Sequence, residues 1–223
     1  MNNRLCAMFG IEAPIFAFSH CRDVVVEVSR AGGLGVLGMA RAHPDRVEED
    51  LRWIDAHIGG RPYGVDILMP AKYEDVAEVD IDALPPEHVA FVQQLLDEAG
   101  VPRLPPDQAD RAARELLAGF HMTPRESLRM LEVCLRHPIK LIVNALGSPP
   151  RDLVERAHAL DIKVGALVGQ VAHARKHRDV GCDLVVAVGT EAAGHTGEIG
   201  SMVLWPRIVD AVAPLPVLGG GGV

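Results

Sequence analysis

The chain has 223 residues, of which 30 are acidic, 22 are basic and 48% are hydrophobic. This composition predicts one globular domain with a sizeable core, and it excludes a disordered tail, a fibre or a tandem array. The net charge of −8, with no Lys and Arg run long enough to override it, argues against a nucleic-acid partner, because a phosphate backbone would repel the protein.

The sequence carries no sign of membrane insertion or secretion. No apolar run approaches the roughly 20 residues of a membrane helix, and the first residues lack the charged and apolar stretches of a secretory signal. The four cysteines are far apart, so we expect reduced thiols rather than a disulfide framework. Together these features predict a cytoplasmic protein without a membrane partner.

Seven short segments rich in Val, Ile and Leu alternate with helical patterns. Their apolar residues run continuously, as in parallel strands covered on both faces, so the pattern predicts an α/β fold with right-handed βαβ crossovers. Regular spacing of this kind suits a doubly wound sheet or a (β/α)8 barrel, and both place their chemistry at the C-terminal ends of the strands. The expected strands are residues 13–18, 34–38, 63–68, 139–144, 162–168, 183–188 and 215–219.

The connection between the third and fourth expected strands is much longer than the others. It contains helical patterns at residues 86–99 and 108–118 and a third helix that opens at Thr123 with a capping-box spacing. We therefore predict a single domain over residues 1–223 with a helical cap inserted at residues 70–136. Such insertions commonly cover an active-site mouth, although a packing role fits the pattern equally well.

Glycine-rich loops follow the sixth and seventh expected strands. The first, residues 189–200, combines four glycines with two carboxylates and His195, whose imidazole can hold a proton near neutral pH. The second, residues 219–222, lets backbone N–H groups approach a ligand closely, as phosphate-binding loops of barrels do. The alternatives are a histidine that lies in a loop by chance and a flexible glycine tail.

Three further patterns carry less weight. The glycines of residues 32–35 precede a strand and lack the spacing of a dinucleotide fingerprint, which excludes a Rossmann site. His173 and His177 stand four residues apart without the Glu of a zinc motif, so they predict a solvated helix face and no metal site. Cys21 beside His20 is a candidate nucleophile, but the default expectation is a buried cysteine that starts a helix.

In their order along the chain, these motifs resemble those of the nitronate monooxygenases, formerly called 2-nitropropane dioxygenases. The loop around His195 is the most specific element, and the other motifs gain weight from their order. The matching segments are Pro14-Ile15, Ser29 to Gly35, Gly64-Val65-Asp66, Gly147 to Pro150, Gly189 to Gly197 and Gly220 to Val223.

The resemblance implies a (β/α)8 barrel that binds FMN without a covalent link, with the flavin ring over the strand ends. By this analogy, the residues that contact FMN are Ala17 and Asp66 beside the ring, Ala192, Ala193 and Gly194 along it, and Gly220, Gly221 and Gly222 at the phosphate.

His195 matches the family's catalytic histidine. The resemblance implies that it removes the α-proton of a nitroalkane or orients a preformed nitronate. The implied reaction oxidises the nitronate with O2 to a carbonyl compound and nitrite, and FMN supplies the redox chemistry. The implied partners are therefore a small nitronate or nitroalkane and O2, and the sequence leaves a homo-oligomer open.

The chain departs from the family's pattern beside the expected flavin. The first strand lacks the Gln of many members, and Asp66 stands where many have Asn. Val188 and Ala193 replace a polar residue and a glycine. A carboxylate next to an anionic reduced flavin is unfavourable unless it is protonated or paired.

Two other functions fit the same residues. One is a flavin-dependent enoyl-acyl-carrier-protein reductase with this barrel and histidine loop, and the other is a non-catalytic, truncated flavin barrel. Since about 250 residues are typical of the barrel, a chain of 223 that carries a helical cap has room for seven βα steps and no eighth strand. We therefore expect a TIM barrel with seven strands present, C-terminally incomplete, from a longer enzyme.

Overall fold

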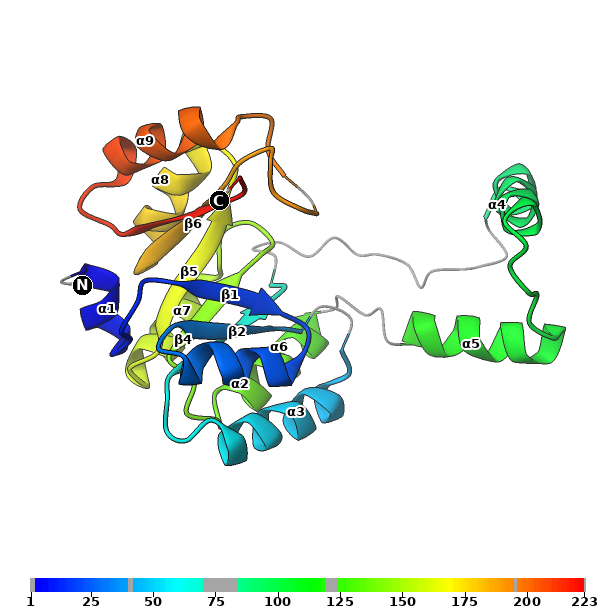
Figure 1. Cartoon of the computed structure of the whole chain (residues 1–223), viewed down its shortest axis with the longest axis horizontal. Coiled ribbons are helices and arrows are strands. Elements are labelled where there is room, and N and C mark those ends of the chain that lie inside the picture. Colours follow the sequence, from blue (N-terminus) through cyan, green and yellow to red (C-terminus); the bar gives the residue numbers. More distant parts are fainter. Residues whose placement is uncertain (1–2, 40–41, 70–83, 119–123, 195, 223) are drawn as a thin grey trace. The chain divides into compact units, whose positions relative to one another are not determined.

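The computed structural model describes residues 3–39, 42–69, 84–118, 124–194 and 196–222. Contacts divide the chain into two compact units, one formed by Met1–Lys72 with Met122–Val223 and the other by Tyr73–His121. The larger unit contains a seven-stranded parallel sheet (Figure 1). No helix within the described ranges is long and apolar enough to cross a membrane.

The strands follow one another across the sheet in chain order. A doubly wound sheet would reverse its strand order, so the sequential order excludes that alternative and confirms the predicted barrel architecture. Every neighbouring pair is parallel, and β1 and β7 are the edges of the described sheet. The strands are β1 (Phe16–Ser19), β2 (Leu34–Gly38), β3 (Tyr63–Ile67), β4 (Leu141–Asn144), β5 (Lys163–Val168), β6 (Leu184–Val188) and β7 (Val217–Gly220).

Helices cover the convex face of the sheet. Val65 and Ile142 share a buried core with Leu51 and Leu131, which come from two of these helices. The helices of this unit's outer layer are α2 (Arg22–Arg30), α3 (Pro44–His57), α6 (Pro124–Cys134), α7 (Arg151–Ala159), α8 (Val171–Val180) and α9 (Ser201–Val212). Since α6 packs on α3 and β3, the third helix of the expected insertion belongs to the barrel unit.

The concave face of the sheet carries a separate apolar core. Val36, Val143 and Leu184 pack there with Leu5 and Phe9 of α1 (Arg4–Phe9). The sequence pattern does not predict α1, because six residues are too few to show a helical period. The helix covers the N-terminal ends of the strands and leaves their C-terminal ends open for a ligand (Figure 1).

The smaller unit contains the two other expected helices, α4 (Pro86–Glu98) and α5 (Pro106–Ala118). In the larger unit, β1 begins at Phe16 rather than at residue 13. The reason is a turn in which the N–H groups of Glu12 and Ala13 both donate to the carbonyl oxygen of Gly32, which keeps this stretch out of the strand ladder.

Candidate active site

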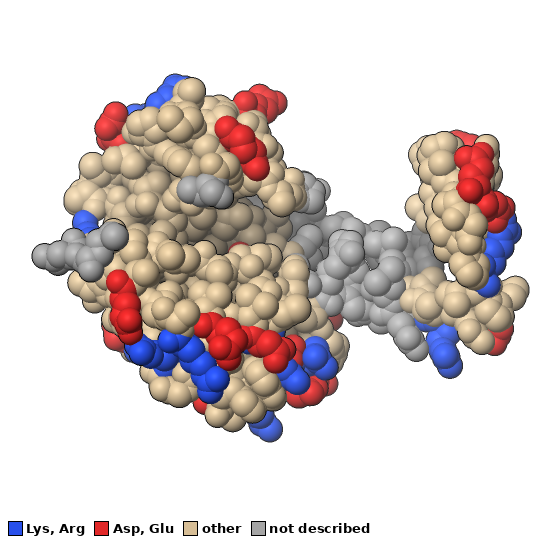
Figure 2. Space-filling view, viewed as in Figure 1, with Lys and Arg blue, Asp and Glu red and all other residues tan. Residues whose placement is uncertain are grey.

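We call the C-terminal end of the concave face the mouth of the barrel. Strand register places the following residues on this face: Phe18, Gly38, Asp66, Val188 and Gly220. In the space-filling view, charged side chains gather over α2 and α3, and fewer lie on the recessed side of the unit between the edge strands β1 and β7 (Figure 2).

Asp66 is the acidic residue on the concave face of β3. Its chain neighbours Val65 and Ile67 belong to the outer core, so the Asp66 side chain projects to the opposite, concave side. The residue is 7% exposed, and its carboxyl has no hydrogen-bond or ion-pair partner among the described residues. Burial raises the pKa of Asp66 to about 7. This carboxyl can therefore hold or release a proton near neutral pH.

Hydrogen bonds join the loop after β6, the start of α9 and the end of β7. The Glu191 carboxylate accepts a bond from the Ser201 N–H at 2.9 Å, and this bond holds the pKa of Glu191 below its usual range. The Ser201 Oγ lies 2.8 Å from Glu191 Oε2 and 2.7 Å from the Gly221 carbonyl oxygen. The Gly189 N–H donates to the Gly220 carbonyl oxygen. The two predicted glycine loops are thus held together.

The N-terminus of α9 already has an anionic partner. Glu191 supplies the negative charge that the helix dipole favours there. A ligand phosphate at the mouth has other donors, since Gly221 and Gly222 have φ angles of 92° and 75° and no described group accepts a bond from their N–H groups. These two backbone donors fit the predicted phosphate contacts.

Ala192 lies directly against Gly221. A Cβ placed on Gly221 would lie 2.7 Å from the backbone nitrogen of Ala192, so this contact and the positive φ angle both require glycine. Ala193 and Gly194 follow as exposed residues of the same loop. The structure therefore brings the small residues predicted to line the flavin next to those predicted to receive its phosphate.

For two of the predicted site residues, the structure shows no side chain at the mouth. His195 lies outside the described residues. Ala17 pairs in register with Gly35, which packs against the backbone of Val25 in α2. The Ala17 side chain thus faces the helix layer, and only its backbone groups are available to a ligand at the mouth.

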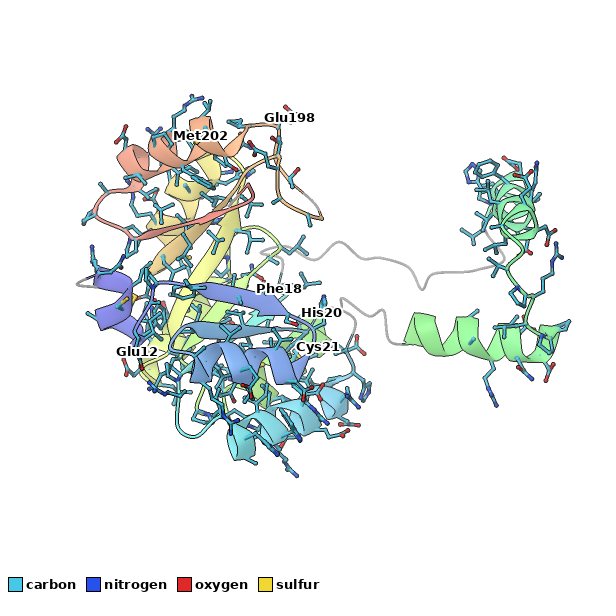
Figure 3. All side chains as sticks on the ribbon, in the orientation of Figure 1. Glu12, Phe18, His20, Cys21, Glu198 and Met202 are labelled. Atoms are coloured by element: carbon cyan, nitrogen blue, oxygen red, sulfur yellow. The ribbon has the colours of Figure 1, made fainter. Side chains whose placement is uncertain are left out.

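Phe18, His20 and Cys21 lie where β1 ends and α2 begins (Figure 3). The His20 Nδ1 is 2.9 Å from the Gly38 carbonyl oxygen, and its ring meets Phe18 edge-on with centroids 5.0 Å apart. Cys21 is exposed at the N-cap of α2, so the expectation of a buried cysteine is wrong. An N-cap residue precedes the helix and here points away from its packed face.

His177 corrects a second expectation, that of a solvated helix face. The residue is 2% exposed, with its Nδ1 2.9 Å from Ser148 Oγ and its Nε2 3.2 Å from the Leu167 carbonyl oxygen. Burial lowers the pKa of His177, whereas His173 lies on the exposed side of α8. The two histidines therefore do not face a common site, and the described residues include no group of three metal-ligating side chains.

Asn144 is a buried polar residue at the C-terminal end of β4 that the sequence motifs do not indicate. It ends β4, is fully buried, and its Oδ1 accepts a bond from the Met69 N–H at 2.9 Å. Its Nδ2 donates to the carbonyl oxygens of Met69, Leu146 and Gly147. Asn144 thus ties the chain after β3 to the loop after β4. The only available signal was a polar residue at the end of an apolar strand.

We expect Ser201→Ala to weaken the junction between the two glycine loops. The Ser201 hydroxyl carries one proton and lies close to two acceptors. Removing the hydroxyl leaves the Gly221 carbonyl oxygen without that partner. The expected cost is about 1–3 kcal/mol of unfolding free energy, because Ser201 is buried. Urea unfolding measures it, with the exposed Thr196→Ala as the control. Equal stability of the two variants would show that the hydroxyl does not support the junction.

Sequential parallel strands and an outer helix layer define a (β/α)-barrel protein, whose candidate site lies at the C-terminal ends of the strands. The sequence model of the nitronate monooxygenase family matches residues 2–223, and the chain belongs to that family. A Mycobacterium tuberculosis relative named "Putative monooxygenase Rv1533" is 49% identical over 229 residues. That match covers 100% of this chain and 60% of the relative.

Two solved structures share the fold. Nitroalkane oxidase from Streptomyces ansochromogenes superimposes with a TM-score of 0.70 at 23% identity, covering 98% of this chain and 61% of that one. The M276A mutant of FabK from Thermotoga maritima gives a TM-score of 0.70 at 21% identity, covering 100% of this chain and 58% of that one. The chain therefore spans about three fifths of the length of the proteins it matches.

Proposed function

We propose that the protein is an FMN-dependent oxidoreductase that oxidises alkyl nitronates, or the nitroalkanes that form them, with O2 to a carbonyl compound and nitrite. The observation that carries the proposal is the joined pair of small-residue loops at the mouth, in a chain of the nitronate monooxygenase family. A planar cofactor needs such loops, because larger side chains would occupy its place.

The residues at the mouth fit FMN by their chemistry. Gly221 and Gly222 offer N–H groups to the phosphate, Gly220 lies beside them, and residues 192–194 present little side-chain bulk to the ring. Asp66 and the backbone of Ala17 contribute from β3 and β1. Bound FMN supplies the electron acceptance that the chain's own side chains lack.

His195 is proposed as the proton acceptor for the α-carbon of a neutral nitroalkane. An imidazole is suited to this step because its ordinary pKa lies near neutrality. With a nitronate, which has already lost that proton, His195 would only orient the substrate.

The test is nitrite release by the FMN-loaded full-length protein in air, with propionate 3-nitronate and the 2-nitropropane anion as substrates. We expect nitrite to accumulate with O2 consumption. Full flavin occupancy without nitrite from either substrate would refute the proposal. In a parallel assay, NADH or NADPH oxidation that requires an enoyl thioester would favour the enoyl reductase alternative, and a colourless protein that FMN cannot reconstitute would favour the non-catalytic one.

A further inference from the structure

Asp66 presents to the mouth a largely buried carboxyl that has no partner among the described residues. Its side chain is 7% exposed and lies on the concave side of β3, at the end of the barrel that α1 leaves open. Buried carboxylates are ordinarily paired with a cation or with hydrogen-bond donors, because an unpaired buried charge is costly.

The described residues packed beside Asp66 offer it no counter-charge. The register partners are Gly38 on β2 and Val143 on β4, and neither side chain titrates. A described titratable side chain beside the partner strand β2 is that of His20, whose Nδ1 lies 2.9 Å from the Gly38 carbonyl oxygen. Asn144, the polar neighbour at the end of β4, uses its amide on backbone groups of other residues. Among the described residues, none therefore stabilises the Asp66 anion.

A carboxyl in such surroundings favours its neutral form, and burial alone raises the pKa of Asp66 to about 7. The neutral acid differs from the anion in what it offers a ligand: it carries one O–H donor as well as acceptor oxygens. A planar ring with carbonyl and imine acceptors at its edge would satisfy that donor.

We propose that Asp66 binds the flavin as a neutral carboxylic acid and donates its O–H to an acceptor atom of the ring, so that flavin binding above neutral pH takes up one proton from solvent. This inference rests on the proposed FMN site. It further identifies Asp66 as a pH-sensing contact of that site, where an asparagine would have offered a permanent donor.

The proposed contact predicts how the affinity for FMN depends on pH. If only the protonated form of Asp66 binds the ring, the apparent dissociation constant for FMN rises about tenfold per pH unit once Asp66 is ionised in the free protein. Asp66→Asn still donates a hydrogen bond but cannot ionise, so its FMN affinity should not change with pH. Asp66→Leu has a similar size and no donor, so it should bind more weakly at every pH.

The experiment is an equilibrium titration of the full-length apoprotein with FMN between about pH 7.5 and 9, where the phosphate, with a second pKa near 6, is already ionised. Calorimetry in two buffers of different ionisation enthalpy gives the protons taken up at about pH 8. We expect close to one proton for the wild-type protein and for the exposed control Asp210→Asn, and none for Asp66→Asn.

The possible outcomes distinguish a failure of this inference from a failure of the proposed function. Wild-type protein that binds FMN without proton uptake, or Asp66→Asn that keeps the wild-type pH dependence, overturns the role of Asp66 and leaves the FMN site standing. Wild-type protein that binds no FMN at any pH overturns the proposed function and the inference with it.

Discussion

Gly221→Ala is expected to lower FMN affinity by at least about 100-fold, which corresponds to roughly 3 kcal/mol of binding free energy. The new Cβ would lie 2.7 Å from the Ala192 backbone nitrogen and 2.9 Å from its Cβ, so the two loops cannot keep their contact. Separating them displaces the Gly221 and Gly222 N–H groups proposed to hold the phosphate. Flavin fluorescence titration measures the change.

Gly59→Ala is the matched control for backbone strain. Gly59 has a φ angle of 66°, and a Cβ built on it meets nothing within 4 Å. Both variants should lose about 1–2 kcal/mol of stability from the left-handed backbone of a non-glycine residue. Only Gly221→Ala should also lose FMN. If both variants bind FMN as the wild type does, the phosphate does not sit at the end of β7.

Asp66→Asn is expected to stabilise the ligand-free protein near pH 8 by up to about 4 kcal/mol, at 1.36 kcal/mol per pKa unit. Burial raises the pKa of Asp66 from 3.8 to about 7 in the folded protein. Between these two values the folded state holds a proton that the unfolded state has lost, so stability falls as the pH rises from about 4 to 7. Asn holds no such proton and carries no such cost.

Urea unfolding of the two proteins at about pH 4.5 and pH 8 tests this expectation. The stability difference between Asp66→Asn and wild type should be small at the lower pH and large at the higher pH. Asp210→Asn, an exposed position on α9, should show no such change. A difference that does not depend on pH would mean that Asp66 does not change its proton affinity on folding.

The architecture was predictable because its signal is local. Each strand of a covered parallel sheet is a short apolar run, and all seven runs became strands. The glycine loops were also visible, since Gly221 and Gly222 adopt positive φ angles that the sequence Gly220-Gly221-Gly222 permits. The spacing of apolar residues and the local composition identify such features without information on tertiary contacts.

The parts that the sequence did not predict depend on contacts between distant segments. Asn144 binds a backbone 75 residues away, and Ser201 binds Gly221, which is 20 residues away. The four-residue spacing of His173 and His177 correctly indicated a helix but not that the second ring is buried against Ser148. Likewise, Asp66 departs from the family pattern in the sequence, while its burial without a partner among the described residues required the structure.

The central claim is that the mouth is an FMN site with its phosphate on the glycines after β7. The most direct measurement is a paired titration of the wild-type apoprotein with FMN and with riboflavin, which lacks the phosphate. We expect one FMN per chain and much weaker binding of riboflavin, because Gly221 and Gly222 then have no anion to bind. Equal affinity for the two flavins, or no binding of either, would contradict the account.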